Sequence, residues 1–122
     1  MVNIVVSLLG NTIEEMYKKV SRTDEKSLIE LRLDSIKNLN PKDVPSYFGS
    51  FMDRCIVTYR NPSEGGMSKD YKITNLIQLI ELMKDHRPYL FDIEADSLKK
   101  ISNSVEIITL YSKQSQKIFF LL

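Results

Sequence analysis

The sequence has little cysteine, no excess of either charge and no long hydrophobic run, and each of these scarcities excludes something. Its one cysteine, Cys55, rules out an internal disulfide and is typical of a reducing compartment, so we expect a cytoplasmic protein. Its 17 basic and 16 acidic residues leave a net charge of +1, which indicates neither a nucleic-acid nor an acidic-membrane partner. No apolar run approaches the ~20 residues of a transmembrane helix.

What the chain does contain is an alternation of strand and helix patterns over 122 residues, the length of one domain. Runs of β-branched and apolar residues predict strands, and apolar residues at helical spacing predict helices. The strands are expected at 2–10, 27–36, 54–60, 88–96 and 104–111, and helices or helical turns at 12–20, 40–52, 71–86 and 97–102. Strands that alternate with helices predict right-handed βαβ units and a parallel sheet.

Polar residues gather on one face of the first four predicted strands, near their C-terminal ends. Because side chains alternate across a strand, each strand has an apolar face and an opposite face. The opposite faces carry Ser7, Glu30, Arg32, Thr58, Arg60, Asp92 and Glu94. A doubly wound sheet would bury these charges under helices, whereas a barrel opens its inner face to a site at the C-terminal mouth. We therefore expect an α/β fold, a parallel (β/α) barrel of the TIM type.

This face also has a plainer interpretation. Taken alone, Glu30 and Arg32 fit a neutralising pair at a surface or sheet edge, and Arg60 fits a solvated strand end. The coincidence on four strands favours a binding site instead. Two arginines in it would suit a small anionic ligand, because a guanidinium binds a carboxylate through two parallel hydrogen bonds. The Glu64-Gly65-Gly66 segment would give a flexible loop that approaches such a ligand closely.

The segments "VVSLLG", "IELRLD", "VTYRNPSEGG" and "FDIEAD", in this order and spacing, resemble type I 3-dehydroquinate dehydratase, the Schiff-base enzyme of the shikimate pathway. The resemblance covers residues 1–111, and its most specific part is the pairing of E-x-R-x-D with a later R-x-x-x-E-G-G. It implies a (β/α)₈ barrel that dehydrates 3-dehydroquinate to 3-dehydroshikimate through a lysine imine, a step of aromatic amino acid biosynthesis, with no cofactor and no metal.

The resemblance also implies site residues, carried over position by position. The substrate-binding positions are Ser7, Glu30, Leu31, Arg32, Arg60, Glu64 and Glu94. Glu64 matches a loop acid beside the substrate, and Glu94 matches a strand acid that lines the pocket. No catalytic residue falls at a family position: Ser112 stands where the acid–base histidine would be, and the imine lysine has no counterpart, although Lys117 superficially resembles it. His86, the single histidine, is expected at a helix C-terminus.

The chain is also shorter than the ~200 residues that a (β/α)₈ barrel needs. We therefore expect a barrel truncated to about five strands, with residues 1–111 as its N-terminal half and 112–122 as a divergent tail. Such an array exposes a strand edge, so a homo-oligomer or a complementary C-terminal half is expected. The family function is 3-dehydroquinate dehydratase, although the chain alone is not expected to dehydrate its substrate. The alternative is an inactive remnant, or a half barrel that binds a small carboxylate.

Overall fold

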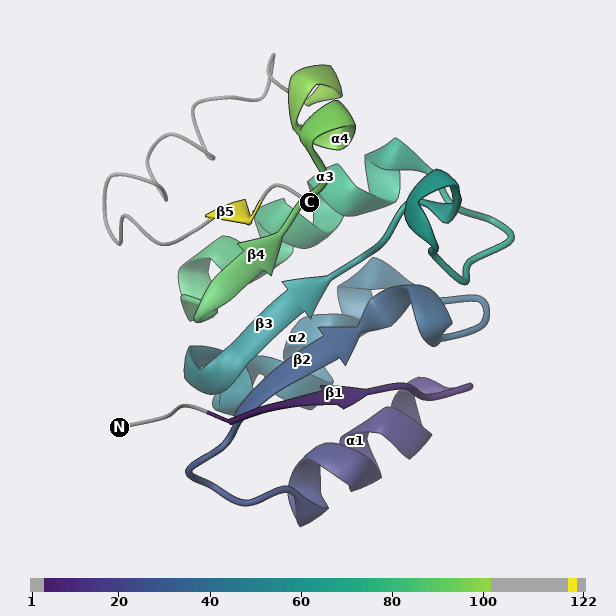
Figure 1. Ribbon diagram of the computed structural model, residues 1–122. Helices are drawn as coiled ribbons and strands as arrows, with labels where there is room; N and C mark the ends of the chain where they lie inside the picture. Colours follow the sequence, from purple (N-terminus) through teal and green to yellow (C-terminus); the bar gives the residue numbers. More distant parts are fainter. Residues whose placement is uncertain (1–3, 102–118, 121–122) are drawn as a thin grey trace.

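A computed structural model describes residues 4–101 and 119–120, which form a parallel sheet with helices along one side (Figure 1). The strands are β1 (Val5–Leu8), β2 (Leu28–Arg32), β3 (Cys55–Thr58), β4 (Leu90–Asp92) and β5 (Phe119–Phe120). They follow one another in the sheet in chain order, and each neighbouring pair is parallel. The predicted parallel α/β sheet is therefore confirmed.

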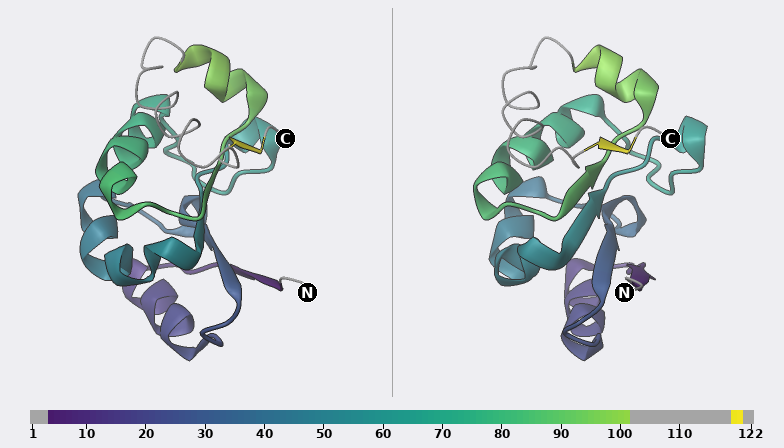
Figure 2. Two further views of the ribbon diagram at one scale, coloured as in Figure 1. Left: turned by 90° about the vertical axis from the view of Figure 1, so that its left-hand side faces the viewer. Right: turned by 60° about the vertical axis from the view of Figure 1, so that its left-hand side comes forward.

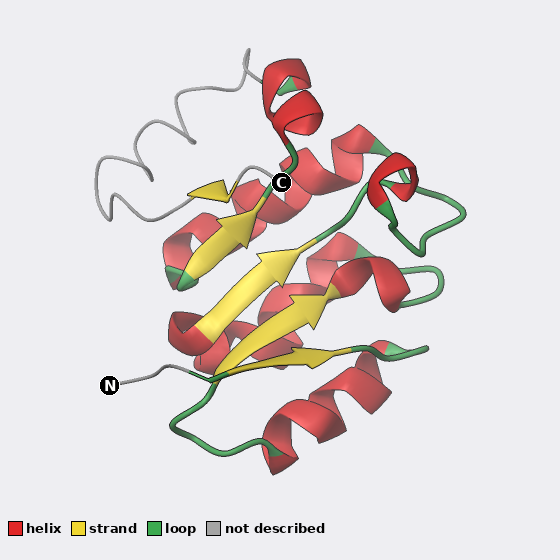
Figure 3. Ribbon diagram, viewed as in Figure 1, coloured by secondary structure: helices red, strands yellow, loops and turns green. Residues whose placement is uncertain are grey.

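The connections between strands carry the helices. The α-helices of the described residues are α1 (Ile13–Arg22), α2 (Val44–Phe48), α3 (Ile73–Met83) and α4 (Ala95–Lys100). Short 3-10 turns join them, namely η1 (Leu33–Ser35), η2 (Pro41–Asp43), η3 (Gly49–Arg54), η4 (Pro62–Glu64) and η5 (Lys84–His86). Figure 2 shows α1, α2 and α3 on the same side of the sheet, and Figure 3 separates these helices from the strands by colour.

Side-chain caps explain where the first connection becomes helical. The Thr12 hydroxyl accepts a hydrogen bond from the Glu15 amide at 3.1 Å, and the Glu15 carboxylate accepts one from the Asn11 amide at 3.1 Å. This reciprocal arrangement is a capping box, which satisfies two amides that the helix itself leaves without partners. The cap therefore starts α1 directly after the turn that closes β1.

The hydrophobic core lies between the apolar face of the sheet and the helices. From the strands and the residues after them it takes Ile29, Leu31, Leu33, Val57, Phe91 and Ile93, and from the helices Met16, Val20, Phe48, Leu76, Leu79 and Ile80. All of these side chains are buried. Since burial of apolar surface is the main favourable term in folding, this core fixes the sheet against its helices and turns the other face of the strands outward.

The second strand is shorter than predicted, because a turn replaces its last residues. β2 ends at Arg32, and Leu33–Ser35 form η1. The Ser35 hydroxyl donates to the Arg32 carbonyl at 2.6 Å and accepts from the Gly10 amide at 3.0 Å. These bonds tie the end of β2 to the end of β1, and they satisfy backbone groups that a longer strand would have paired.

The last predicted strand falls outside the described residues, since 104–111 is not among them. The described fifth strand instead comes from the segment 112–122, which was expected to be a tail. In it, Phe119 and Phe120 pair in parallel with Phe91 and Asp92 of β4.

Candidate functional site

The face of the strands opposite the core is built from polar side chains. We call it the polar face, made of Ser7, Glu30, Arg32, Thr58, Arg60, Asp92 and Glu94. Within the described residues, α1–α3 cover only the other side of the sheet (Figure 2). The strand pairing sets Ser7 beside Glu30, and it sets Thr58 beside both Arg32 and Asp92. The shared face predicted from the period-two pattern is therefore present.

Glu30 lies at the centre of a hydrogen-bonded chain across the first three strands. Its carboxylate accepts one hydrogen bond from the Ser7 hydroxyl and another from the Thr58 hydroxyl, the latter at 2.8 Å. Thr58 is fully buried. Donors from both neighbouring strands hold the Glu30 carboxylate in one orientation, which prepares it to accept a further hydrogen bond from a ligand.

Arg60 and Asp92 form a buried ion pair between the third and fourth strands. The Arg60 Nη2 lies 2.6 Å from Asp92 Oδ2, and the two residues are 9% and 8% exposed. Burial raises the pKa of Asp92, and the charge of Arg60 opposes that rise. The other carboxylate oxygen, Oδ1, is buried and has no hydrogen-bond partner among the described residues.

Arg32 is held in a similar way by an acid two residues along the chain. Its guanidinium makes two hydrogen bonds to the Asp34 carboxylate, at 3.0 and 2.9 Å, and these raise the pKa of Arg32. Asp34 is buried and also accepts from the Met67 amide at 3.0 Å, so it joins η1 to the loop after β3. Each arginine predicted to receive an anionic ligand is therefore already paired with a carboxylate of its own chain.

Glu94 fixes the loop that follows the third strand. Its carboxylate accepts from the Asn61 amide at 2.6 Å and from the Ser97 hydroxyl at 3.0 Å. The loop then turns through Gly65, which has a φ of 90°, and returns so close to β3 that a Cβ on Gly66 would lie 2.0 Å from the Arg60 carbonyl oxygen. The two glycines of the motif therefore have different roles, one in a left-handed turn and one in a close backbone approach.

The predicted substrate-binding residues divide into three groups. Ser7, Glu30, Arg32, Arg60 and Glu94 lie on the polar face, as described above. Glu64 lies exposed in η4 and is not part of the hydrogen-bonded chain. Leu31 has its side chain in the core, 0% exposed and on the opposite side of β2 from Glu30, so its predicted contact with substrate would have to come from its backbone.

Three residues of the site were not predicted as site residues. Thr58 and Asp92 had been placed on the correct face by alternation, but their pairing with Glu30 and Arg60 depends on strand register, which the sequence does not display. Asp34 had been placed in a strand, although it lies in a turn. The E-x-R-x-D spacing was the available signal for Asp34, since it sets an acid two residues from Arg32.

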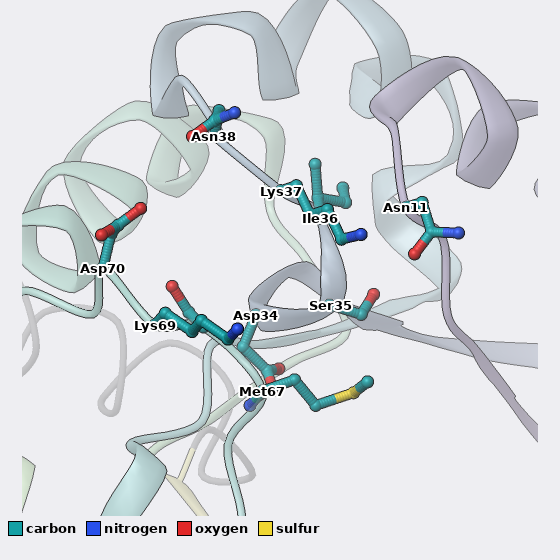
Figure 4. A pocket seen from close by; sticks show the side chains of 10 residues that line it. Asn11, Asp34, Ser35, Ile36, Lys37, Asn38, Met67, Lys69 and Asp70 are labelled. Carbon is teal, nitrogen blue, oxygen red and sulfur yellow. Dashed lines mark hydrogen bonds between the residues drawn. The ribbon is translucent and has the colours of Figure 1, made fainter.

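A pocket of about 400 Å³ adjoins the polar face beyond the carboxyl ends of β1 and β2. It is lined by Asn11, Asp34, Ser35, Ile36, Lys37, Asn38, Met67, Ser68, Lys69 and Asp70. Figure 4 shows Lys69 and Asp70 on one side of it and Asn11 on the other. Because Asp34 contacts Arg32 and also lines this pocket, the pocket meets the polar face at the Arg32–Asp34 pair.

The strands that form the polar face supply no amine and no imidazole, since β1–β4 contain neither lysine nor histidine. His86 is exposed in η5, which precedes β4, and its ring lies next to Gly49 of η3, so it sits at the opposite end of the sheet. Ser112, Lys113 and Lys117 lie outside the described residues. Within the described part of the chain, no group of three or more His, Cys, Asp or Glu side chains could hold a metal ion.

Comparison with known proteins gives one clear result. A model of the type I 3-dehydroquinase family matches residues 4–118, which is nearly the whole chain. The search of curated proteins found no match. No helix in the described ranges, 4–101 and 119–120, is long and apolar enough to cross a membrane.

Proposed function

Because this chain belongs to the type I 3-dehydroquinase family, we propose that it takes part in the dehydration of 3-dehydroquinate to 3-dehydroshikimate by binding the substrate. The observation that supports this best is the polar face itself, where polar and charged side chains from four strands and the residues directly after them are held in fixed orientations by one another. The substrate carries hydroxyls, a ketone and a carboxylate, and such a ligand needs both acceptors and donors in a preorganised arrangement.

In this proposal the substrate hydroxyls donate to Glu30 and Glu94, and the arginines donate to substrate oxygens. A guanidinium has five N–H donors, and the ion pair of Arg60 is made by its Nη2 alone, so a ligand can use its other donors. Ser7 is exposed at the edge of the same face and adds a hydroxyl. Glu64 would reach the ligand from its loop, and Arg32 would approach it from the side of the Asp34 pocket.

We also propose that the sheet forms part of a (β/α) barrel of the TIM type, with the polar face lining its interior. The support is the parallel order of the strands, the helices on one side only, and the polar groups near the strand C-termini. A barrel closes on itself, so the partner for the open edges would be a second copy of this chain or a complementary C-terminal half. We propose the cytoplasm as the location of this enzyme.

The imine step needs an amine that attacks the substrate ketone and a group that moves a proton. Since β1–β4 contain no lysine or histidine, we propose that these strands bind the substrate and that the reacting groups come from outside them. The family match lends no support to the alternative of an inactive remnant.

Calorimetric titration with 3-dehydroquinate tests the binding proposal. We expect a measurable affinity for the full chain, and a loss of about 10- to 150-fold in Arg60→Ala, since a hydrogen bond to a charged group contributes about 1.5–3 kcal/mol. Arg22→Ala, which removes an exposed arginine of α1, is the matched control and should bind as the parent chain does. Equal affinities for the Arg60→Ala and Arg22→Ala variants would show that the substrate does not bind at the polar face.

A further inference from the structure

The pocket of about 400 Å³ beyond β1 and β2 is a separate compartment from the polar face. It lies between the three loops that follow β1, β2 and β3. Asp34 stands between the two places with a fully buried side chain, and both its oxygens accept hydrogen bonds, from the Arg32 guanidinium and from the Met67 amide. A ligand in this pocket therefore meets other side chains than a substrate on the polar face does.

Hydrogen bonds between the three loops fix the walls of this pocket. The Lys37 amide donates to the Asn11 carbonyl at 3.0 Å, which joins the second loop to the first. The Met67 amide donates to the Asp34 carboxylate at 3.0 Å, which joins the third loop to the second. The pocket is therefore formed before a ligand arrives, as most small-molecule sites are.

Two lysines line the pocket, and neither is paired with an acid. In the described part of the chain, the side chains of Lys37 and Lys69 make no ion pair and no hydrogen bond. The lining also contains two acids, but Arg32 neutralises Asp34, which leaves Asp70. The unpaired charges are then two positive and one negative, so the pocket favours an anion.

The charged groups come from different sides of the pocket. Figure 4 shows Lys69 and Asp70 on one side. Lys37 extends toward Asn11 on the other side. An anion placed between the two sides can contact a lysine from each, and hydroxyls on the rest of the ligand can donate to the Asp70 carboxylate.

We propose that this pocket binds a phosphate ester of a small hydroxylated molecule, with the phosphate between Lys37 and Lys69 and a hydroxyl on Asp70. A phosphate has several charged oxygens and can contact two separate ammonium groups, whereas a carboxylate is recognised best by the planar fork of an arginine. The described lining contains lysines and no arginine. Its volume also leaves room for an organic body beside the phosphate. The site goes beyond the proposed function and does not depend on it.

An amide NMR titration of the full chain with glycerol 3-phosphate tests this site. We expect saturable shifts of the amides of Lys37, Ser68 and Lys69, which belong to the loops around the pocket. The amide of Thr58, in the strand that carries the polar face, should stay unchanged. Sodium chloride at the same ionic strength is the control for screening by salt and should not produce these shifts.

Inorganic phosphate and glycerate divide the ligand into its parts. Glycerate has a carboxylate in place of the phosphate ester, and inorganic phosphate has no organic body. We expect each to bind more weakly than glycerol 3-phosphate, because each lacks one of the two groups that the pocket contacts. An affinity for either that equals the affinity for glycerol 3-phosphate would overturn the assignment of a phosphate ester.

Substitution of the lysines tests the assigned contacts. Lys37→Gln and Lys69→Gln should each weaken the affinity for glycerol 3-phosphate about fivefold, the effect of losing an ion pair at an exposed position. Lys18→Gln removes an exposed lysine of α1 and should bind as the parent chain does. All three side chains are exposed, so the substitutions leave the core intact.

Two further results would overturn the inference. One is a set of shifts centred on Thr58 instead of the loops, and the other is an unchanged affinity in both Lys37→Gln and Lys69→Gln. Calorimetry with 3-dehydroquinate is expected to give the same affinity for Lys69→Gln as for the parent chain. Failure of the phosphate ester site and failure of the proposed function are therefore distinguishable.

Discussion

At the scale of single residues, the site is a set of acids whose donors come from neighbouring strands. Alternation along each strand predicted correctly that Glu30 and Arg60 share a face, because side chains in a strand have a strict period of two. It could not predict the pairings, since these depend on which residues the register sets opposite one another. Leu31 shows why a carried-over motif has to be separated into side chain and backbone, because its side chain lies in the core although it stands inside E-x-R-x-D.

Thr58→Val tests the hydrogen-bonded chain at this scale. The substitution keeps the shape of a fully buried side chain and removes the hydroxyl that donates to Glu30. We expect the free energy of unfolding, measured with urea, to fall by about 1–3 kcal/mol, because a partly buried carboxylate loses one of its two donors. Thr74→Val makes the same change at an exposed position of α3 and should alter stability by less than about 0.5 kcal/mol. Equal effects of the two substitutions would contradict the role given to Thr58.

At the scale of elements, the sequence predicted the order and type of most segments, and it was least accurate at their ends. Strand 27–36 was too long because Ser35 binds backbone groups of Gly10, a contact between residues 25 positions apart. The helix predicted at 71–86 is α-helical only from Ile73 to Met83 and continues as the 3-10 turn η5. Arg87, with a φ of 51°, then turns the chain toward Pro88. Such ends are set by long-range contacts and local turns, which hydrophobic periodicity does not encode.

The loop after β3 provides a prediction at this scale, because its two glycines differ in their surroundings. Gly65→Ala should cost roughly 1–2 kcal/mol of stability, since its φ of 90° is unfavourable for a side chain although no atom lies within 4 Å of the new Cβ. Gly66→Ala should cost about 3 kcal/mol or more, because its Cβ would overlap the Arg60 backbone. Urea unfolding of the two variants measures the difference. The reverse order of stabilities would contradict the close approach at Gly66.

At the scale of the whole molecule, the described sheet is open, and its first strand has one paired edge. β1 pairs with β2, and within residues 4–101 and 119–120 it has no second strand partner. Val5, the first residue of this strand, is 49% exposed, and Ile4, directly before it, is 65% exposed. The parallel array and its polar face could be predicted from the sequence, whereas closure into a barrel depends on pairing between the two outer edges, which no local pattern contains.

The exposed first strand predicts self-association. Unpaired backbone groups beside exposed β-branched side chains form a template for another strand, and a charge there opposes such pairing. We expect the parent chain to sediment as a dimer or larger species in analytical ultracentrifugation, and Val5→Lys to shift it toward the monomer. Thr74→Lys, which adds the same charge on α3, should leave the distribution unchanged. A monomeric parent chain would show that the edge is not an interface.

The most direct test of the central claim, that the polar face binds 3-dehydroquinate, is an amide NMR titration of the full chain with this substrate. We predict that the amides that shift are those of Ser7, Glu30, Thr58, Arg60 and Glu94, while the core side of α1 and α3 stays unchanged. The same spectra follow the substrate, and we predict that its signals remain those of 3-dehydroquinate, because Ser112 stands where the family has its acid–base histidine and no lysine matches the position of its imine lysine. Shifts confined to the helices, or no shifts, would contradict binding at the polar face, and the appearance of 3-dehydroshikimate would contradict the expectation that this chain alone does not dehydrate its substrate.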